Sequence, residues 1–372
     1  MALPATASAS PGFYGLAELP EEFASASFFW VSDEGLAGGA ASAASGGDSQ
    51  AIVYSIGSGL RTFDTLPGGI MNALHVSGGS RDGQTLVGSA LTDRGIQAFR
   101  YSEGSGTEIL APREAVGPTA DWAQAFASDA DRVVGSSNGA ATVWDGGLGP
   151  VSLGSLNASF VNAYAYDASA DGRRVVGKSW NESFDFQAFL WTEESGMIGL
   201  GSEHGSGYGE AVGISADGST VVGITTEAGP YAPFVWTESS GLRPLAAPTG
   251  FGWSSFPDSF FSLDVSGDGS VVVGGGLFGI GSDPEAFIYS PTEGVRALSD
   301  HLESLGIDLA GWTLSEARAV SEDGRFIVGS GIDPSGRSSG WLVVIPEPGT
   351  AIQLALGLAV LSGLGASRSA GT

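Results

Sequence analysis

The segment from Ala211 to Leu245 reads AVGISADGSTVVGITTEAGPYAPFVWTESSGLRPL and contains four short extended runs. These runs are Ala211–Ser215, Thr220–Gly223, Ala232–Thr237 and Leu242–Leu245. Asp217-Gly218 predicts a tight turn between the first two runs, because glycine accepts the positive φ that such turns require. Ser239-Ser240-Gly241 predicts a second turn, and the β-branched residues of the runs favour a pleated strand. Four antiparallel strands of this length are typical of one blade of a β-propeller.

The same pattern returns along the chain. A run that ends in Val-Val-Gly or a near variant closes at Gly88, Gly135, Gly177, Gly223, Gly274 and Gly329. A seventh, degraded copy occupies residues 31–39 and 50–54. Between Gly15 and Ile345 the spacing is about 47 residues per unit, which lies in the range of propeller repeats. The sequence therefore predicts seven blades.

The last unit lacks its fourth strand. It supplies runs at 317–321, 326–330 and 340–345, and the missing Gly-Leu-x-x-Leu strand stands instead at Gly15–Leu19. We expect an all-β, seven-bladed propeller of four-stranded blades, closed by pairing of this N-terminal strand into the last blade, which removes an exposed edge. An open stack or two packed sheets is the alternative. One short helix is expected at 299–305, capped by Ser299 and ended by Gly306.

The repeat unit resembles the HAF repeat family of bacterial extracellular proteins. The resemblance rests on the Ser-x-Asp-Gly-x-x-Val-Val-Gly turn and on a Gln-Ala-Phe-x-Trp strand such as Gln187–Trp191. The namesake histidine is replaced at Gln97, Gln187, Ala232 and Glu285, so it is not carried over as a site. Segment 298–312 is similar to the last-repeat insertion of that family. The resemblance implies the propeller at residues 13–345 and an extracellular location, and it assigns no chemistry.

The C-terminal segment 346–372 resembles a PEP-CTERM sorting signal of Gram-negative bacteria. Pro346-Glu347-Pro348 is followed by an apolar run, expected to be helical, at 351–366 and then by Arg368. The resemblance implies a transient inner-membrane anchor and removal of the tail near Glu347 by an exosortase. An unstructured apolar tail, or a helix docked on the ring, is the alternative.

The N-terminal segment 1–12 is expected to be disordered. Residues 1–10 have no basic region and no apolar core, but Ala5-Thr6-Ala7 and Ala7-Ser8-Ala9 show the small-x-small pattern of signal-peptidase sites. We interpret the segment as the remnant of a signal peptide whose leader is missing from the sequence. An ordinary disordered N-terminus is the alternative.

Composition narrows the function classes. The chain has no cysteine, so it has no disulfide and no thiolate metal site. It carries 41 acidic against 15 basic residues, for a net charge of −26, and Lys178 is its single lysine. Such a surface repels nucleic acid and anionic membranes at long range, and we do not expect nucleic acid as a partner. The histidines His75, His204 and His301 show no metal-ligand spacing, and no cofactor is expected.

Two further patterns invite a chemical interpretation. Gly336–Gly340 matches Gly-x-Ser-x-Gly, but a nucleophile elbow needs a strand before it and a helix after it, so a glycine-rich hairpin is favoured. The aspartates of the Asp-Gly turns are either turn acceptors or a ring of calcium ligands, and we favour the turn. The recurring aromatics are expected in the core between blades; they are Phe99, Trp144, Phe189, Trp191, Phe234, Trp236 and Phe287.

Function is sought in what does not repeat. The loops after the second and fourth strands emerge on one face and vary in length, at 111–124, 178–186, 202–210, 248–260 and 275–284. Aromatic platforms beside acids suit sugar rings, whose C–H faces stack while their hydroxyls donate to carboxylates. The candidate ligand-binding residues are Trp122, Trp180, Glu182, Asp185, Tyr208, Glu210, Tyr231, Trp253 and Asp258. The alternative is that these aromatics fold back to cover the blades.

Three functions remain. The first is a non-catalytic protein of the cell surface or extracellular (biofilm) matrix that binds polysaccharide or protein through the variable loops. The second is an extracellular glycan hydrolase or lyase that uses two loop-face carboxylates about 5 to 10 Å apart. The third is a structural spacer without a specific ligand.

Overall fold

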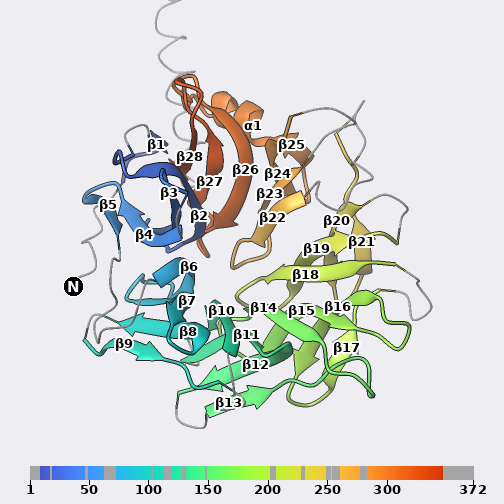
Figure 1. Cartoon of the computed structure of the whole chain (residues 1–372). Helices are drawn as coiled ribbons and strands as arrows, with labels where there is room; N and C mark the ends of the chain where they lie inside the picture. Colours follow the sequence, from blue (N-terminus) through green and yellow to red (C-terminus); the bar gives the residue numbers. More distant parts are fainter. Residues whose placement is uncertain are drawn as a thin grey trace, which may run out of the picture.

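The computed structural model describes residues 9–16, 19–46, 49–62, 73–102, 104–112, 119–127, 131–146, 149–201, 207–227, 231–248, 253, 260–276 and 283–346. Over these residues the chain folds into seven β-sheet blades arranged in a ring (Figure 1). This confirms the predicted all-β propeller. Asp258, Glu347, Pro348, Arg368 and the apolar run 351–366 lie outside the described residues, as do residues 1–8. None of the described helices is long and apolar enough to cross a membrane.

Each blade is a meander of four antiparallel strands, with the first strand nearest the ring axis. The first three blades hold β2 (Phe23–Val31), β3 (Ala37–Ala43), β4 (Ser49–Ser55), β5 (Gly59–Thr62); β6 (Ala73–Gly79), β7 (Thr85–Thr92), β8 (Gly95–Ser102), β9 (Gly106–Ile109); and β10 (Thr119–Ala127), β11 (Arg132–Ser137), β12 (Ala140–Asp145), β13 (Gly149–Ser152). The next three hold β14 (Ala163–Ala168), β15 (Arg174–Trp180), β16 (Phe186–Thr192), β17 (Gly196–Gly199); β18 (Gly209–Ile214), β19 (Thr220–Thr225), β20 (Ala232–Thr237), β21 (Gly241–Pro244); and β22 (Phe260–Val265), β23 (Val272–Gly276), β24 (Glu285–Ser290), β25 (Gly294–Ala297). The seventh blade holds β26 (Thr313–Val320), β27 (Phe326–Ile332), β28 (Ser338–Val344) and β1 (Gly12–Gly15).

The N-terminal strand closes the ring, as predicted. β1 pairs antiparallel with β28, from Gly12 opposite Val344 to Gly15 opposite Trp341. The predicted bounds Gly15–Leu19 are wrong, because the paired strand lies three residues earlier. The reason is the Phe13 ring, which packs against the Trp312 ring with 5.6 Å between centroids and so sets the register.

The short helix α1 (Leu298–Ser304) joins β25 to β26. Leu298 and Leu302 are fully buried in the core beside it. The helix ends before Gly306, whose φ is +75°, as expected. The predicted cap is wrong: the N-cap is Ala297, which has no polar side chain, whereas Ser299 lies inside the helix and its side chain bonds Glu285.

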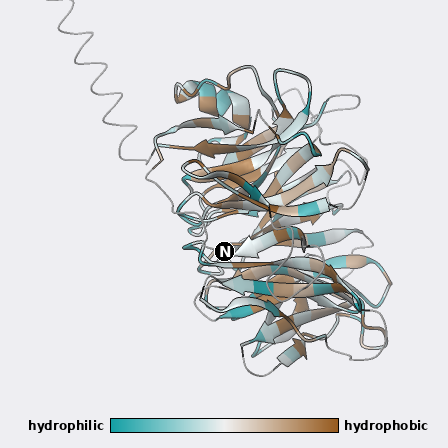
Figure 2. Ribbon diagram, turned by 60° about the vertical axis from the view of Figure 1, so that its left-hand side comes forward, coloured by the Kyte–Doolittle hydropathy of each residue, from teal (hydrophilic) through white to brown (hydrophobic). Residues whose placement is uncertain are grey.

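Apolar side chains fill the spaces between neighbouring blades, and Figure 2 shows hydrophobic residues along the stacked strands. Phe99, Phe189, Phe234 and Phe287 are buried there, as is Trp144, which confirms the expected core. Trp191 and Trp236 are half-buried at its edge.

The recurring Val-Val-Gly has a steric cause. A Cβ at Gly177 would lie 1.9 Å from the Tyr164 carbonyl oxygen, and one at Gly223 would lie 2.0 Å from that of Glu210. The innermost strand comes this close to the glycine where it carries a β-bulge. Six of the seven innermost strands have such a bulge immediately after the residue that pairs with the glycine. The extra residues of these bulges line the axis of the ring: Phe29, Ser77, Gln124, Tyr166, Val212 and Arg318.

The Asp-Gly turns confirm the turn interpretation. Asp217 Oδ1 accepts hydrogen bonds from Ser215 Oγ at 2.6 Å and from the Ser219 amide at 2.8 Å, and Gly218 has φ +73°. The turns at Asp82, Asp171, Asp268 and Asp323 repeat this pattern. Gly336–Gly340 likewise belongs to the hairpin of β27 and β28: Gly336 lies in the turn, and Ser338–Gly340 begin β28 rather than a helix.

Candidate functional site

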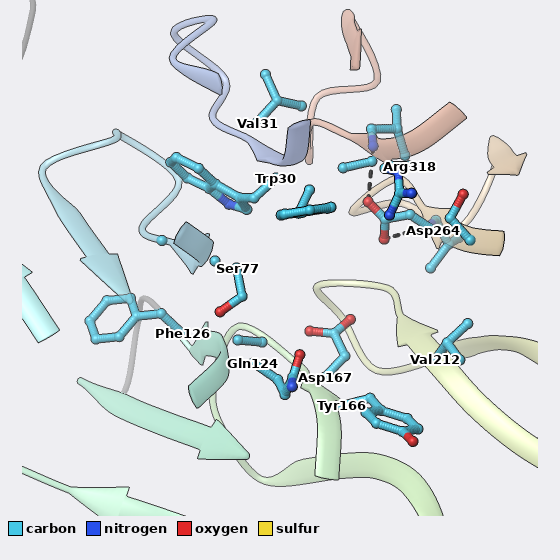
Figure 3. Close-up of a pocket in the computed structure, with 18 of the residues that line it drawn as sticks. Trp30, Val31, Ser77, Gln124, Phe126, Tyr166, Asp167, Val212, Asp264 and Arg318 are labelled. Atoms are coloured by element: carbon cyan, nitrogen blue, oxygen red, sulfur yellow. Dashed lines mark hydrogen bonds between the residues drawn. The ribbon is translucent and has the colours of Figure 1, made fainter. Parts of the chain in front are cut away.

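The ring encloses a central channel of about 840 Å³. It is lined by residues of all seven innermost strands, several of which Figure 3 labels. We call the end with Trp122 and Glu210 the mouth, since these residues lie beside the variable loops. The end with Arg81 and Glu322 is the base, since these residues belong to the Asp-Gly turns. A cavity of this size is typical of small-ligand sites.

Three rings from neighbouring blades meet at the mouth. His75 stacks on Trp122 with 5.7 Å between ring centroids, and it meets Phe29 edge-on at 6.1 Å. The Arg318 guanidinium lies 4.9 Å from the Phe29 ring centroid. Burial lowers the pKa of His75 to about 4, so its imidazole is neutral at physiological pH. Trp122 was expected in a loop, but it lies within β10 on the channel wall.

Lys178 joins the channel wall to the outer surface of the mouth. Its Nζ donates to Glu210 Oε2 at 3.0 Å and to Tyr208 Oη at 3.1 Å. The same ammonium lies 4.9 Å from the Phe186 ring centroid and 5.6 Å from that of Tyr166. Burial alone lowers the pKa of Lys178, but the Glu210 carboxylate outweighs it, and the net shift is upward. The lysine is therefore a charged structural group that the sequence reasoning did not place in the site, although its uniqueness in the sequence could have drawn attention to it.

An aromatic row runs outward from Lys178 across the variable-loop face. Trp180 stacks on Phe160 at 5.2 Å and contacts Phe186 at 5.8 Å. Phe186 contacts Tyr208 at 6.3 Å, and Tyr208 contacts Tyr231 at 5.7 Å. Thus the structure brings together four of the predicted residues, Trp180, Tyr208, Glu210 and Tyr231. We use the name aromatic row for Phe160, Trp180, Phe186, Tyr208 and Tyr231.

The other predicted residues have different surroundings. Glu182 Oε1 accepts the Ala158 amide at 2.9 Å, so this carboxylate joins two loops. Asp185 closes the same loop through its amide, which donates to Asn181 Oδ1 at 3.1 Å. Trp253 packs on Phe287 at 5.7 Å and donates its indole N–H to the Leu245 carbonyl, so it covers the sixth blade. It does not line the channel.

Two carboxyl groups in the middle of the channel were missed from the sequence. Asp167 accepts the amides of Ala168 at 2.8 Å and of Ile214 in the next blade at 2.9 Å. Asp264 accepts the amides of Val265 at 2.8 Å and, again in the next blade, of Val320 at 2.9 Å. Each therefore ties one blade to its neighbour, and both point into the channel in Figure 3.

Both carboxyl groups bind protons more tightly than usual. Burial, reinforced by the charge of Asp264, raises the pKa of Asp167 to about 8. Burial raises the pKa of Asp264 to about 7. A sequence signal existed. Asp167 and Asp264 each lie two residues before the serine of a turn, as the first residue of Asp-x-Ser-x-Asp-Gly. The other blades have Gly, Ala or Trp at the equivalent position of the innermost strand. Within the described residues no group of three or more acids or histidines is arranged to hold a metal ion.

No protein-family model and no curated protein matches the sequence. Among solved structures, the chain is similar to the β-propeller domain of the Trilobed protease from Pyrococcus furiosus, at 8% identity and a TM-score of 0.54, over 87% of this chain and 93% of that one. It is also similar to the tricorn protease, at 12% identity and a TM-score of 0.54, over 90% of this chain and 34% of that one. The Pyrococcus propeller is described as having an open velcro topology, whereas here β1 pairs with β28. At these identities the likeness establishes the fold alone: the chain is a β-propeller.

Proposed function

We propose that the protein is an exported, non-catalytic propeller that binds an extracellular polysaccharide at the mouth of its channel. The observation that carries this proposal is the continuity of the aromatic row with the channel through Lys178. Along this path ring faces alternate with polar groups such as Glu210 and Tyr208, which is the lining that sugar rings require. The outer end of the row is accessible, because Phe160 there is 49% exposed, and the other four rings are half-buried.

The position of the C-terminal tail fits this proposal. β28 ends at Val344, which pairs with Phe326 beside the Asp323-Gly324 turn. Pro346 therefore leaves the ring at the base, opposite the mouth. A chain held at a membrane through the residues after Pro346 presents its mouth away from that membrane. The paired strands are complete at Val344, so removal of the tail near Glu347 takes no strand from the ring.

A glycan hydrolase is the second candidate, because the channel contains the carboxyl pair Asp167 and Asp264. We favour binding, since both oxygens of each carboxyl accept a backbone amide and so serve to join blades. Incubation of the protein with candidate glycans, followed by assay of reducing ends, separates the two. Turnover that is lost in Asp264→Asn would favour the hydrolase.

Binding is tested by titrating oligosaccharides into the protein while tryptophan fluorescence is recorded. We expect Trp180→Ala to weaken binding at least tenfold, because one stacking platform is lost. Val151→Ala is the matched control, since Val151 is 49% exposed on the outer strand of another blade. Equal affinity of the wild type and Trp180→Ala would refute a site on the aromatic row.

Export and tail processing are tested separately. The gene with its upstream codons is expressed in a Gram-negative host that has an exosortase, and the intact mass and location of the product are measured. We expect an extracellular product trimmed near Glu347. An untrimmed product inside the cell would contradict the sorting proposal and would leave the binding proposal to be judged by titration.

A further inference from the structure

We propose that the channel binds a protonated primary amine of the ligand between Asp167 and Asp264, so that the polysaccharide is one that carries free amino groups. This inference rests on the proposed function and names the chemical class of its ligand. A linear polyamine offers the same ammonium chemistry, and the experiment below distinguishes the two sources.

The first argument is that these two carboxyl groups have no cation of their own. Within the described residues, Asp167 and Asp264 make hydrogen bonds to backbone amides and take part in no ion pair. Each oxygen accepts one amide, and a carboxylate oxygen has two lone pairs, so each retains an acceptor position toward the channel. A ligand ammonium has three donors that can fill these positions.

The second argument concerns the charged groups around them. The cations of the channel wall are already engaged: Arg81 pairs with Asp33 and Glu322, and Arg318 pairs with Glu316. Five acids line the channel against two arginines; these residues are Asp33, Asp167, Glu210, Asp264, Glu322, Arg81 and Arg318. Among the described residues, the channel acids that lack a cation partner are thus Asp167 and Asp264, in the middle of the channel. The net charge of −26 adds a long-range attraction for cations.

The third argument is that the same wall already holds an ammonium. Lys178 Nζ is surrounded by a carboxylate, a phenol and the faces of Phe186, Tyr208 and Tyr166. Tyr166 precedes Asp167 in the chain and lines the channel. An amine that moves from the mouth toward Asp167 therefore passes a ring that already stabilises one cation. The channel volume of about 840 Å³ is sufficient for a sugar-sized ligand.

Binding of a cation is expected to release protons. An ammonium favours the ionised form of a nearby carboxyl group, so it lowers the raised pKa values of Asp167 and Asp264. Affinity for an amine that stays protonated should therefore rise between pH 6 and pH 8. The other titratable or charged groups that line the channel are Asp33, His75, Arg81, Tyr166, Glu210, Arg318 and Glu322. His75 is already neutral in this range, so it does not produce the effect.

The experiment is calorimetric titration of the full chain with three probes. They are a glucosamine trisaccharide, its N-acetylated counterpart and spermidine, first at pH 6.5, where spermidine is fully protonated and the glucosamine amines are partly protonated. We expect the glucosamine trisaccharide to bind at least tenfold more tightly than the acetylated one. With spermidine, whose primary amines titrate near pH 10, affinity should rise several-fold from pH 6 to pH 8. Titrations of the wild type in buffers of different ionisation enthalpy should show that protons are released on binding. This measurement does not depend on whether a variant folds.

Variants locate the site. Asp167→Asn and Asp264→Asn should each weaken binding of the glucosamine trisaccharide at least tenfold, whereas Asp93→Asn, an exposed acid in the turn between β7 and β8, should not. Equal binding of both trisaccharides would overturn the ammonium site and leave the proposed function intact. Binding of spermidine alone, sensitive to Asp264→Asn, would support the ammonium site with a polyamine as its source and contradict the polysaccharide. Amine binding that is unchanged in both channel variants would overturn the site.

Discussion

The carboxyl pair of the channel predicts that the fold loses stability as the pH rises from 5 to 7. The pKa of Asp167 is about 8 and that of Asp264 about 7, against an ordinary value of 3.8. In this interval the folded protein keeps protons that the unfolded chain has released. The stabilising effect of protonation is complete below pH 4 and is lost as the pH rises through the folded pKa values. At about 1.4 kcal/mol per pH unit, each group contributes a loss of about 2 to 3 kcal/mol, and the pair about 5 kcal/mol.

The assay is urea unfolding of the wild type and of Asp264→Asn at pH 5, 6 and 7, followed by tryptophan fluorescence. An asparagine oxygen accepts one of the two amides well, so the variant has a cost of about 1 to 3 kcal/mol that does not depend on pH. Because the variant cannot ionise, the stability difference between wild type and variant should shrink by about 2 kcal/mol from pH 5 to pH 7. Asp93→Asn should keep the wild-type slope. Parallel curves for the wild type and Asp264→Asn would refute the reasoning.

Three further predictions concern the ring and its mouth. Gly177→Ala should cost about 3 kcal/mol or more in thermal unfolding, because its Cβ meets a carbonyl oxygen at 1.9 Å, whereas Gly104→Ala, with open space around it, should be nearly neutral. Phe13→Ala should cost about 2 kcal/mol by loosening β1, and hydrogen exchange should show faster exchange in β28; unchanged protection there would contradict the closure. Lys178→Met should cost about 3 kcal/mol by leaving Glu210 without its cation, and Glu210→Gln in the same chain should restore most of it; additive losses would refute the coupling.

Much of the ring was predictable because its signals are local. Asp-Gly turns, β-branched runs and a recurring glycine each act through neighbours within one hairpin, so the repeat predicted blades, blade number and closure. The bounds of β1 were wrong because they depend on where Phe13 packs against Trp312 and Trp341, residues about 300 positions away. The helix cap was wrong because Ser299 bonds Glu285 of β24 instead of its own backbone.

The candidate site was likewise predictable only in part. The aromatics Trp180, Tyr208 and Tyr231 were predicted from their place outside the repeated pattern, and they do gather on one face. Trp122 and Trp253 look alike in sequence, but the first lines the channel and the second covers a blade, which only packing distinguishes. Asp167 and Asp264 are 97 positions apart and share a channel because the ring brings every first strand to one axis.

By itself, the sequence determined the repeat and the turn chemistry, because backbone sterics and hydrogen bonding act over a few residues. The structure supplied the reason for the glycine of Val-Val-Gly, since a Cβ there would meet a carbonyl oxygen of the neighbouring strand. Tertiary structure alone decided which side chains face the channel. A bulge turns one additional residue of the innermost strand toward the axis, and ring closure then places Tyr166, Arg318 and the two half-buried carboxyl groups around one cavity. Their raised pKa values follow from that enclosure, since burial and the proximity of like charges exist only when the blades have assembled.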